Sequence, residues 1–141
     1  MAQLKNQLQR HSVALISLFV AVSSLGYNTW RNEKTEANRN IRSAGVEMLL
    51  QLGELDRIVF FSHYDMDEVR GSPRSGWAYV LTIRDLGRLT MSPAIESSEA
   101  VMQVWQRSWP GLGKDDASAK AISDSIDLAR EDVLQVLASL E

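Results

Sequence analysis

The chain has 141 residues, enough for one domain, and its formal net charge is −3 at pH 7. It contains no cysteine, which excludes disulfides, thiolate metal sites and cysteine-based catalysis. The mild acidity leaves no basic stripe to neutralise phosphates, so we expect no nucleic-acid partner.

The first predicted element is a helix that spans a membrane. No charged residue occurs from Val13 to Trp30, and these eighteen residues would extend about 27 Å as a helix, close to the ~30 Å hydrocarbon core of a bilayer. The Val, Leu, Ile and Phe side chains together favour insertion into the bilayer by roughly 2 to 5 kcal/mol. The rings of Tyr27 and Trp30 suit the membrane–water interface at the end of the span. The residues expected to form this anchor are Val13, Leu15, Ile16, Leu18, Phe19, Val20, Val22, Leu25, Tyr27 and Trp30.

Two other interpretations of this stretch stay open. One is a cleaved export signal, because Lys5 and Arg10 precede an apolar core of about ten residues and Ser24-Leu25-Gly26 provides small residues after it. The other is the buried helix of a soluble domain. That interpretation is disfavoured because apolar residues occupy every side of the segment, and a small domain cannot easily cover them all.

The predicted organisation has four parts: a short cytoplasmic amino terminus at 1–11, a transmembrane anchor at 12–30, a helical stalk at 31–40 and a soluble helical-bundle domain at 41–141. A short basic segment before one apolar span is typical of an uncleaved signal-anchor. We therefore expect the bundle to face the periplasm from a bacterial inner membrane. Basic residues after the span favour the opposite orientation, but long domains cross membranes largely regardless of charge.

The soluble part predicts an all-α fold, an antiparallel bundle of about four helices. Two long helices carry apolar seams whose residues follow one another in alternating steps of four and three. The first seam is Ile41, Gly45, Met48, Leu52, Leu55 and Val59, widened by Leu49 and Phe60; the second is Ile122, Ile126, Ala129, Val133, Val136 and Leu140. Asp115 and Asp116 precede the second long helix, where negative charge favours a helix amino end.

Two shorter helices are predicted between the long ones. Glycines and a proline at 70–76 mark a loop, and the apolar residues that follow fit helical spacing better than strand alternation. Ser92 and Pro93 predict the start of the next helix, with Trp105 on its inner face. We expect Ser97 and Ser98 of that helix to face solvent.

The acidic segment "SHYDMDE" at 62–68 offers candidate metal ligands. His63, Asp67 and Glu68 are weak candidates, because imidazole and carboxylate groups bind divalent cations. His63 and Asp67 would share a helix face, but Asp65 would point away, and the EF-hand glycine is absent. We therefore predict a solvated helix end here, with no metal, no cofactor and no catalytic residue in the chain.

Trp109 and Trp77 are candidates for an interaction surface, because tryptophan is favoured at binding hot spots; the alternative is packing between helices. These features predict a non-catalytic, single-pass membrane protein that acts as an interaction or assembly subunit. Its expected partners are the lipid bilayer and other membrane or periplasmic proteins. A homo-oligomer is a further expectation, since heptad seams pair between chains as well as within one. Alternative functions are a ligand-sensing bundle that signals through a partner, and a metal-binding protein or hydrolase built on His63.

Overall fold

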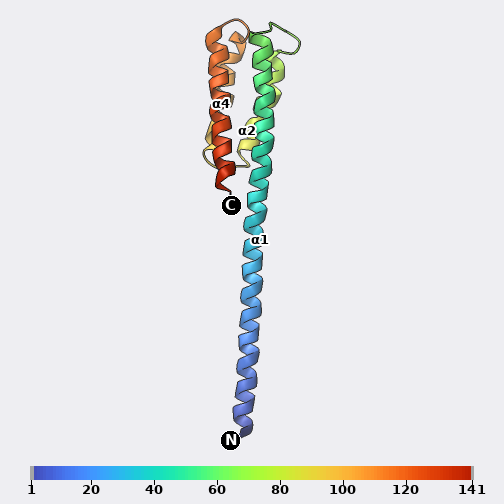
Figure 1. Ribbon diagram of the computed structural model, residues 1–141, viewed down its shortest axis with the longest axis vertical. Coiled ribbons are helices and arrows are strands. Elements are labelled where there is room, and N and C mark those ends of the chain that lie inside the picture. The colour runs from blue at the N-terminus through green and yellow to red at the C-terminus, as the bar shows by residue number, and fades with distance from the viewer. Residues whose placement is uncertain (1, 141) are drawn as a thin grey trace. The chain divides into compact units, whose positions relative to one another are not determined.

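The computed structural model describes the backbone of residues 2–140 and the side chains of residues 11–140. This part of the chain is all-α and contains no strand, which confirms the predicted fold class. The elements are α1 (Ala2–His63), α2 (Pro73–Gly87), α3 (Ala94–Ser108), the 3-10 helix η1 (Trp109–Gly111) and α4 (Asp116–Ser139) (Figure 1). The chain divides into two compact units, Met1–Ala37 and Asn38–Glu141.

The first unit consists of the amino-terminal part of α1. From Val13 to Trp30 its large apolar side chains are all exposed, from 56% for Val20 to 73% for Phe19. Among the described residues α1 is the one helix long and apolar enough to cross a membrane, and none of its apolar window is buried. Lys5 and Arg10, the basic residues of the export-signal interpretation, have side chains outside the described part.

The second unit is a four-helix bundle in which α2 and α3 run antiparallel. Gly76 at the start of α2 lies against Trp105 near the end of α3, and Gly87 at the end of α2 lies against Ser98 near the start of α3. A Cβ atom on Gly76 would come 2.2 Å from Trp105 Cζ2. The absence of a side chain at this position therefore lets the two helices approach closely.

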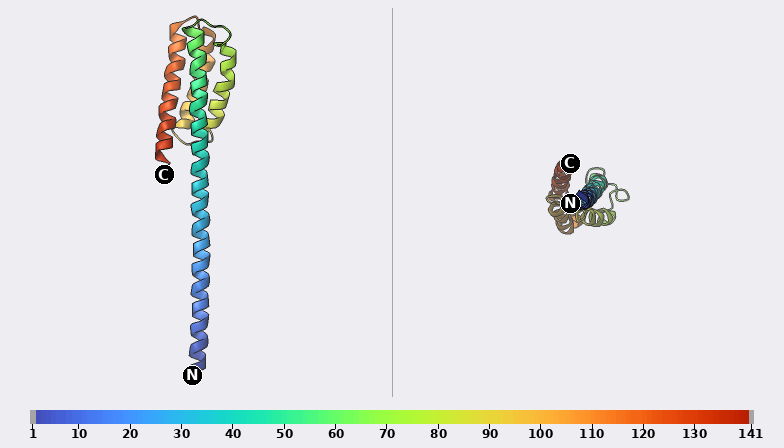
Figure 2. Two further views of the ribbon diagram at one scale, coloured as in Figure 1. Left: turned by 45° about the vertical axis from the view of Figure 1, so that its right-hand side comes forward. Right: turned by 90° about the horizontal axis from the view of Figure 1, so that it is seen from below.

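The bundle part of α1 runs antiparallel to α4, and the two ribbons lie side by side in both Figure 1 and Figure 2. Gly45 packs against Leu137 near the end of α4, and His63 at the other end of the segment lies beside Asp116 at the start of α4. The Arg42 guanidinium also donates to the carbonyl of Leu140 at 2.9 Å. Short connections and alternating helix directions are typical of an up-down-up-down bundle.

Both predicted seams form the core of this bundle. Their central residues are at most 2% exposed: Met48, Leu52, Leu55 and Val59 of α1, and Ile122, Ile126, Ala129, Val133 and Val136 of α4. Burial of each large aliphatic side chain contributes roughly 1.5 to 3 kcal/mol. The seams therefore supply much of the apolar surface that holds the bundle together.

The prediction that Phe60 widens the buried seam of α1 is wrong. Phe60 is 51% exposed, whereas Ile58 is only 7% exposed. Both residues lie about 100° around the helix axis from Val59, on opposite sides. Ile58 and Tyr79 of α2 line one small cavity, so α2 covers the side that Ile58 occupies. The spacing alone does not say which side of a seam a neighbouring helix will cover.

The prediction that Ser97 and Ser98 face solvent is also wrong, since they are 4% and 0% exposed. The Ser98 hydroxyl packs against Gly87 and donates to the Ile95 carbonyl at 2.7 Å, so its burial leaves no unpaired donor. Small side chains here allow α2 and α3 to pack closely. Helix α3 begins at Ala94, one residue later than predicted. The hydroxyl of Ser92, the predicted capping residue, donates to the Glu96 carboxylate at 2.6 Å.

Candidate functional site

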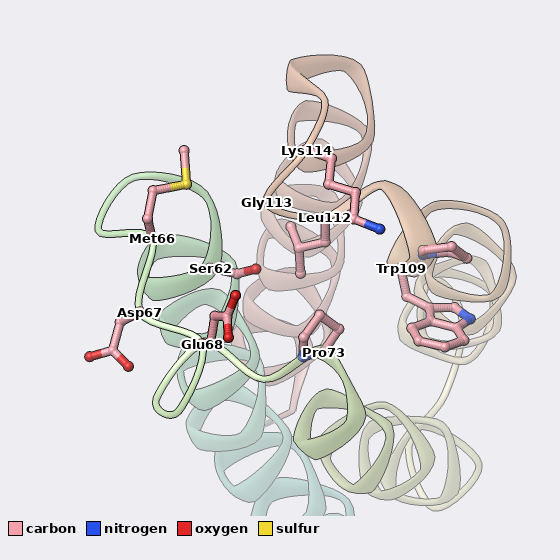
Figure 3. Close-up of a pocket in the computed structure, with 11 residues that line it drawn as sticks. Ser62, Met66, Asp67, Glu68, Pro73, Trp109, Leu112, Gly113 and Lys114 are labelled. Atoms are coloured by element: carbon pink, nitrogen blue, oxygen red, sulfur yellow. The ribbon is translucent and has the colours of Figure 1, made fainter.

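A cleft of about 400 Å³ lies at the end of the bundle where α1 ends and α4 begins (Figure 3). Its walls come from the segment after α1, the start of α2, η1 and the loop that leads into α4. Apolar surface comes from Met66, Pro73, Trp109 and Leu112, and charged groups come from Glu68 and Lys114. An apolar pocket with a few polar groups is the usual form of a small-molecule site.

Two glycines bring the loops of the cleft together on Ser62. A Cβ atom on Gly71 would lie 2.2 Å from the Ser62 backbone nitrogen, and one on Gly113 would lie 2.9 Å from the Ser62 carbonyl oxygen. Gly113 also has a φ angle of +79°, which favours glycine. Larger residues at these two positions would separate the loops and reshape the cleft.

Asp67, a weak candidate metal ligand, is engaged within its own loop. Its carboxylate accepts hydrogen bonds from the Val69 and Arg70 backbone N–H groups at 3.0 and 2.8 Å, and from Arg70 Nε at 2.6 Å. The Arg70 backbone bond is the main reason that the pKa of Asp67 falls below its ordinary value of 3.8. Arg70 in turn stacks over the Phe61 ring at 4.3 Å. The carboxylate therefore stabilises the turn that follows α1.

His63, the second weak candidate, faces α4 and joins the two long helices. Its Nε2 atom lies 3.3 Å from Asp116 Oδ1, and its Nδ1 atom is buried without a hydrogen-bond partner. Asp67 and Glu68 line the cleft, but His63 does not. Within the part of the chain whose side chains are described, no group of three or more His, Asp or Glu residues is arranged to hold a metal ion.

The two tryptophans predicted as an interaction surface lie together. Trp77 and Trp109 are half-buried and pack against the core, with ring centroids 6.3 Å apart and an angle of 72° between the rings. Trp109 also forms one wall of the cleft. Each ring keeps some exposed surface, and a role in binding stays a prediction for both residues.

No sequence pattern predicted the other residues of the cleft, which include Met66, Pro73, Leu112 and Lys114. They belong to two loops about forty residues apart in the sequence. No local pattern relates them, because they meet only when α1 packs against α4. The glycines and prolines of both loops were the one available signal, and they indicated turns without indicating a site.

Asp115 caps the amino end of α4, where the sequence predicted that negative charge would be favourable. Its carboxylate accepts from the backbone N–H groups of Ala117 and Ser118 at 2.9 and 3.3 Å, and from the Ser118 hydroxyl. The Ser118 hydroxyl bond is the largest cause of a lowered pKa for Asp115, below its ordinary value of 3.8; the nearby His63 contributes least. Asp115 is therefore a charged cap at the edge of the cleft.

We expect the Asp115 cap to make a pH-dependent contribution to the stability of the bundle. A carboxylate with a lowered pKa in the folded state stabilises it fully above pH 3.8, and this contribution is lost as the pH falls through the lower folded-state pKa. The variant Asp115→Asn keeps a capping oxygen but lacks the charge. Thermal unfolding followed by circular dichroism should give the wild type the higher midpoint at pH 7, and the difference should shrink well below pH 3.8. A difference that stays constant with pH would contradict this explanation.

No protein-family model matches the chain, and no curated protein or solved structure matches it.

Proposed function

We propose that this chain is a single-pass membrane protein whose helical bundle acts as a non-catalytic interaction or assembly subunit. The observation that carries the proposal is the exposed apolar surface of α1 between Val13 and Leu25. All eight of its Val, Leu, Ile and Phe side chains are more than half exposed. A continuous apolar surface of this kind is unfavourable in water and suits contact with lipid.

The core of the bundle supports the same conclusion. Its buried and partly buried apolar residues begin at Ile41, so the hydrophobic core contains no side chain from the apolar stretch. A helix also satisfies its backbone hydrogen bonds internally, as lipid requires. At one end of the stretch, Tyr27 and Trp30 lie with their rings 6.1 Å apart, and Arg31 follows them. Aromatic and basic residues of this kind suit the membrane interface.

The proposed location is a bacterial inner membrane, with the bundle facing the periplasm. Lys5 and Arg10 before the span favour a cytoplasmic amino terminus, and a domain as large as the bundle crosses a membrane largely regardless of its charge. In this arrangement the half-buried Trp77–Trp109 pair is available to other membrane or periplasmic proteins. Aromatic side chains with partly exposed surfaces are frequent anchors at protein interfaces.

Fractionation and protease protection test the proposal on the whole chain in cells. We expect the chain in the membrane pellet after an alkaline wash, and we expect added protease to digest the bundle in spheroplasts but not in intact cells. Recovery as a soluble protein without detergent would contradict the anchor, as would a mature form that begins near Tyr27. Protection of the bundle in spheroplasts would contradict only the periplasmic orientation.

A ligand-sensing bundle is a second candidate, and the cleft is the observation that favours it. Trp109 offers an aromatic wall, and Glu68 and Lys114 offer opposite charges. Thermal unfolding of the detergent-solubilised chain in the presence of small molecules discriminates between the two functions. A ligand that raises the unfolding midpoint of the wild type but not that of Lys114→Ala would favour sensing.

A further inference from the structure

Helix α1 carries a second apolar stripe that the bundle does not use. Val46, Leu50, Phe60 and Tyr64 are 48%, 61%, 51% and 69% exposed. Together with Gly53 and Arg57 they follow one another in alternating steps of four and three residues. We call these six residues the outer stripe. It lies about 150° around α1 from the core seam, on nearly the opposite side of the helix, so packing within the bundle leaves its large apolar side chains exposed.

The spacing of the outer stripe is that of a surface made for another helix. Apolar residues in alternating steps of three and four form the seam of a coiled coil, in which side chains of one helix fit between those of its partner. Singly exposed apolar residues are ordinary on protein surfaces, but here two exposed apolar pairs, Val46 with Leu50 and Phe60 with Tyr64, share one register on either side of Gly53 and Arg57. Tyr64 continues the row just beyond α1, since its N–H still donates to the Phe60 carbonyl at 2.9 Å.

The same register, counted back along the sequence, reaches Leu25, Val22, Leu18 and Leu15. These residues are also exposed, at 59% or more. A helix that matched both rows would need apolar residues at the same spacing over the same length. A second copy of this chain has apolar residues at the same spacing, because its sequence is identical. In a parallel two-fold pair each stripe residue then meets its own counterpart. Insertion of both copies into one bilayer with the same sidedness makes their α1 helices parallel.

The polar residues around the outer stripe suit such a pair. Gly53 lies in its middle and adds no side chain to the row, although the Arg130 guanidinium of α4 lies 3.5 Å from the place a Cβ atom would take. The charge of Arg57 is balanced by Glu54 at 2.9 Å. Arg42 and Glu47 flank the row five residues apart, the spacing at which opposite charges face each other across a parallel coiled coil.

We propose that this chain forms a parallel homodimer along the outer stripe of α1. The orientation rests on the proposed membrane anchor, whereas the contact surface rests on the exposed residues of the bundle. The dimer would cover the largest row of exposed apolar side chains on α1 outside the membrane-spanning stretch. It also leaves the cleft accessible, because no outer-stripe residue lines it.

The absence of native cysteine allows a direct test by cross-linking in isolated membranes. The variant Leu50→Cys places one thiol on the outer stripe, and Leu128→Cys is a matched control on α4, at a leucine that is 52% exposed. With a short bis-maleimide we expect Leu50→Cys to give a product of twice 15.8 kDa, several-fold more abundant than the product from Leu128→Cys. Co-expression with a longer, tagged copy should add a third band of intermediate size.

A second pair of variants tests the contact without relying on the thiol at position 50. In the Val46→Cys background, Leu50→Arg is expected to abolish the dimer band, whereas Leu128→Arg should leave it unchanged. Equal cross-linking at positions 50 and 128, a band unaffected by Leu50→Arg, or a product with a different protein would each overturn the homodimer. Membrane fractionation of the same samples separates the two proposals. A chain in the pellet without the dimer band overturns the dimer alone, and a soluble chain overturns the anchor.

Discussion

The double variant Leu18→Arg/Val22→Arg is expected to appear in the soluble fraction instead of the membrane pellet. The eight Val, Leu, Ile and Phe side chains of the span favour insertion by roughly 2 to 5 kcal/mol in total. Each arginine near the centre of a span costs about 2.5 to 3.5 kcal/mol, so two of them exceed the whole favourable contribution. Cell fractionation followed by an alkaline wash of the pellet measures the outcome.

The matched control adds the same charges to the bundle. Leu128 and Leu134 are 52% and 54% exposed on α4, and Leu128→Arg/Leu134→Arg should remain in the pellet with an unchanged unfolding midpoint. Release of this control would show that added charge alone changes the location. Retention of Leu18→Arg/Val22→Arg after the alkaline wash would contradict a transmembrane anchor formed by this stretch.

The two long helices were predictable because each buries one continuous seam. The alternating spacing of Met48, Leu52 and Leu55, and of Ile126, Ala129 and Val133, reports a single buried face, which any packing partner must cover. The charged cap at Asp115 was predictable for a similarly local reason, since its main partners lie within three residues along the chain. Features of this kind depend on one helix at a time.

The features that were missed depend on pairs of elements. Ile58 is buried in place of Phe60 because α2 covers one side of α1, and Ser98 is buried because Gly87 leaves room for it. A serine that bonds to its own helix looks the same in sequence whether it faces solvent or another helix. The cleft depends on two loops meeting at Ser62, so no single segment contains its pattern.

The buried tryptophan of α3 is expected to make the largest contribution to the stability of the bundle. Trp105 is fully buried in the core, and Gly76 lies directly against its ring. Trp105→Ala should lower the free energy of unfolding by about 3 to 5 kcal/mol, because the helices can fill only part of the space it leaves. That loss is a large share of the roughly 5 to 15 kcal/mol available to a domain. Urea unfolding of the detergent-solubilised chain, followed by circular dichroism, measures it.

A double-mutant cycle shows whether the contact between Trp105 and Gly76 is the cause. Gly76→Ala alone should be destabilising, because the added methyl group would lie 2.2 Å from Trp105 Cζ2. In the Trp105→Ala background the same methyl group enters vacated space, so its cost should fall or reverse. Trp105→Phe should cost less than Trp105→Ala, since it keeps a ring and removes an indole N–H that has no partner among the described residues. Additive effects of Gly76→Ala and Trp105→Ala would show that α2 and α3 are not held together by this contact.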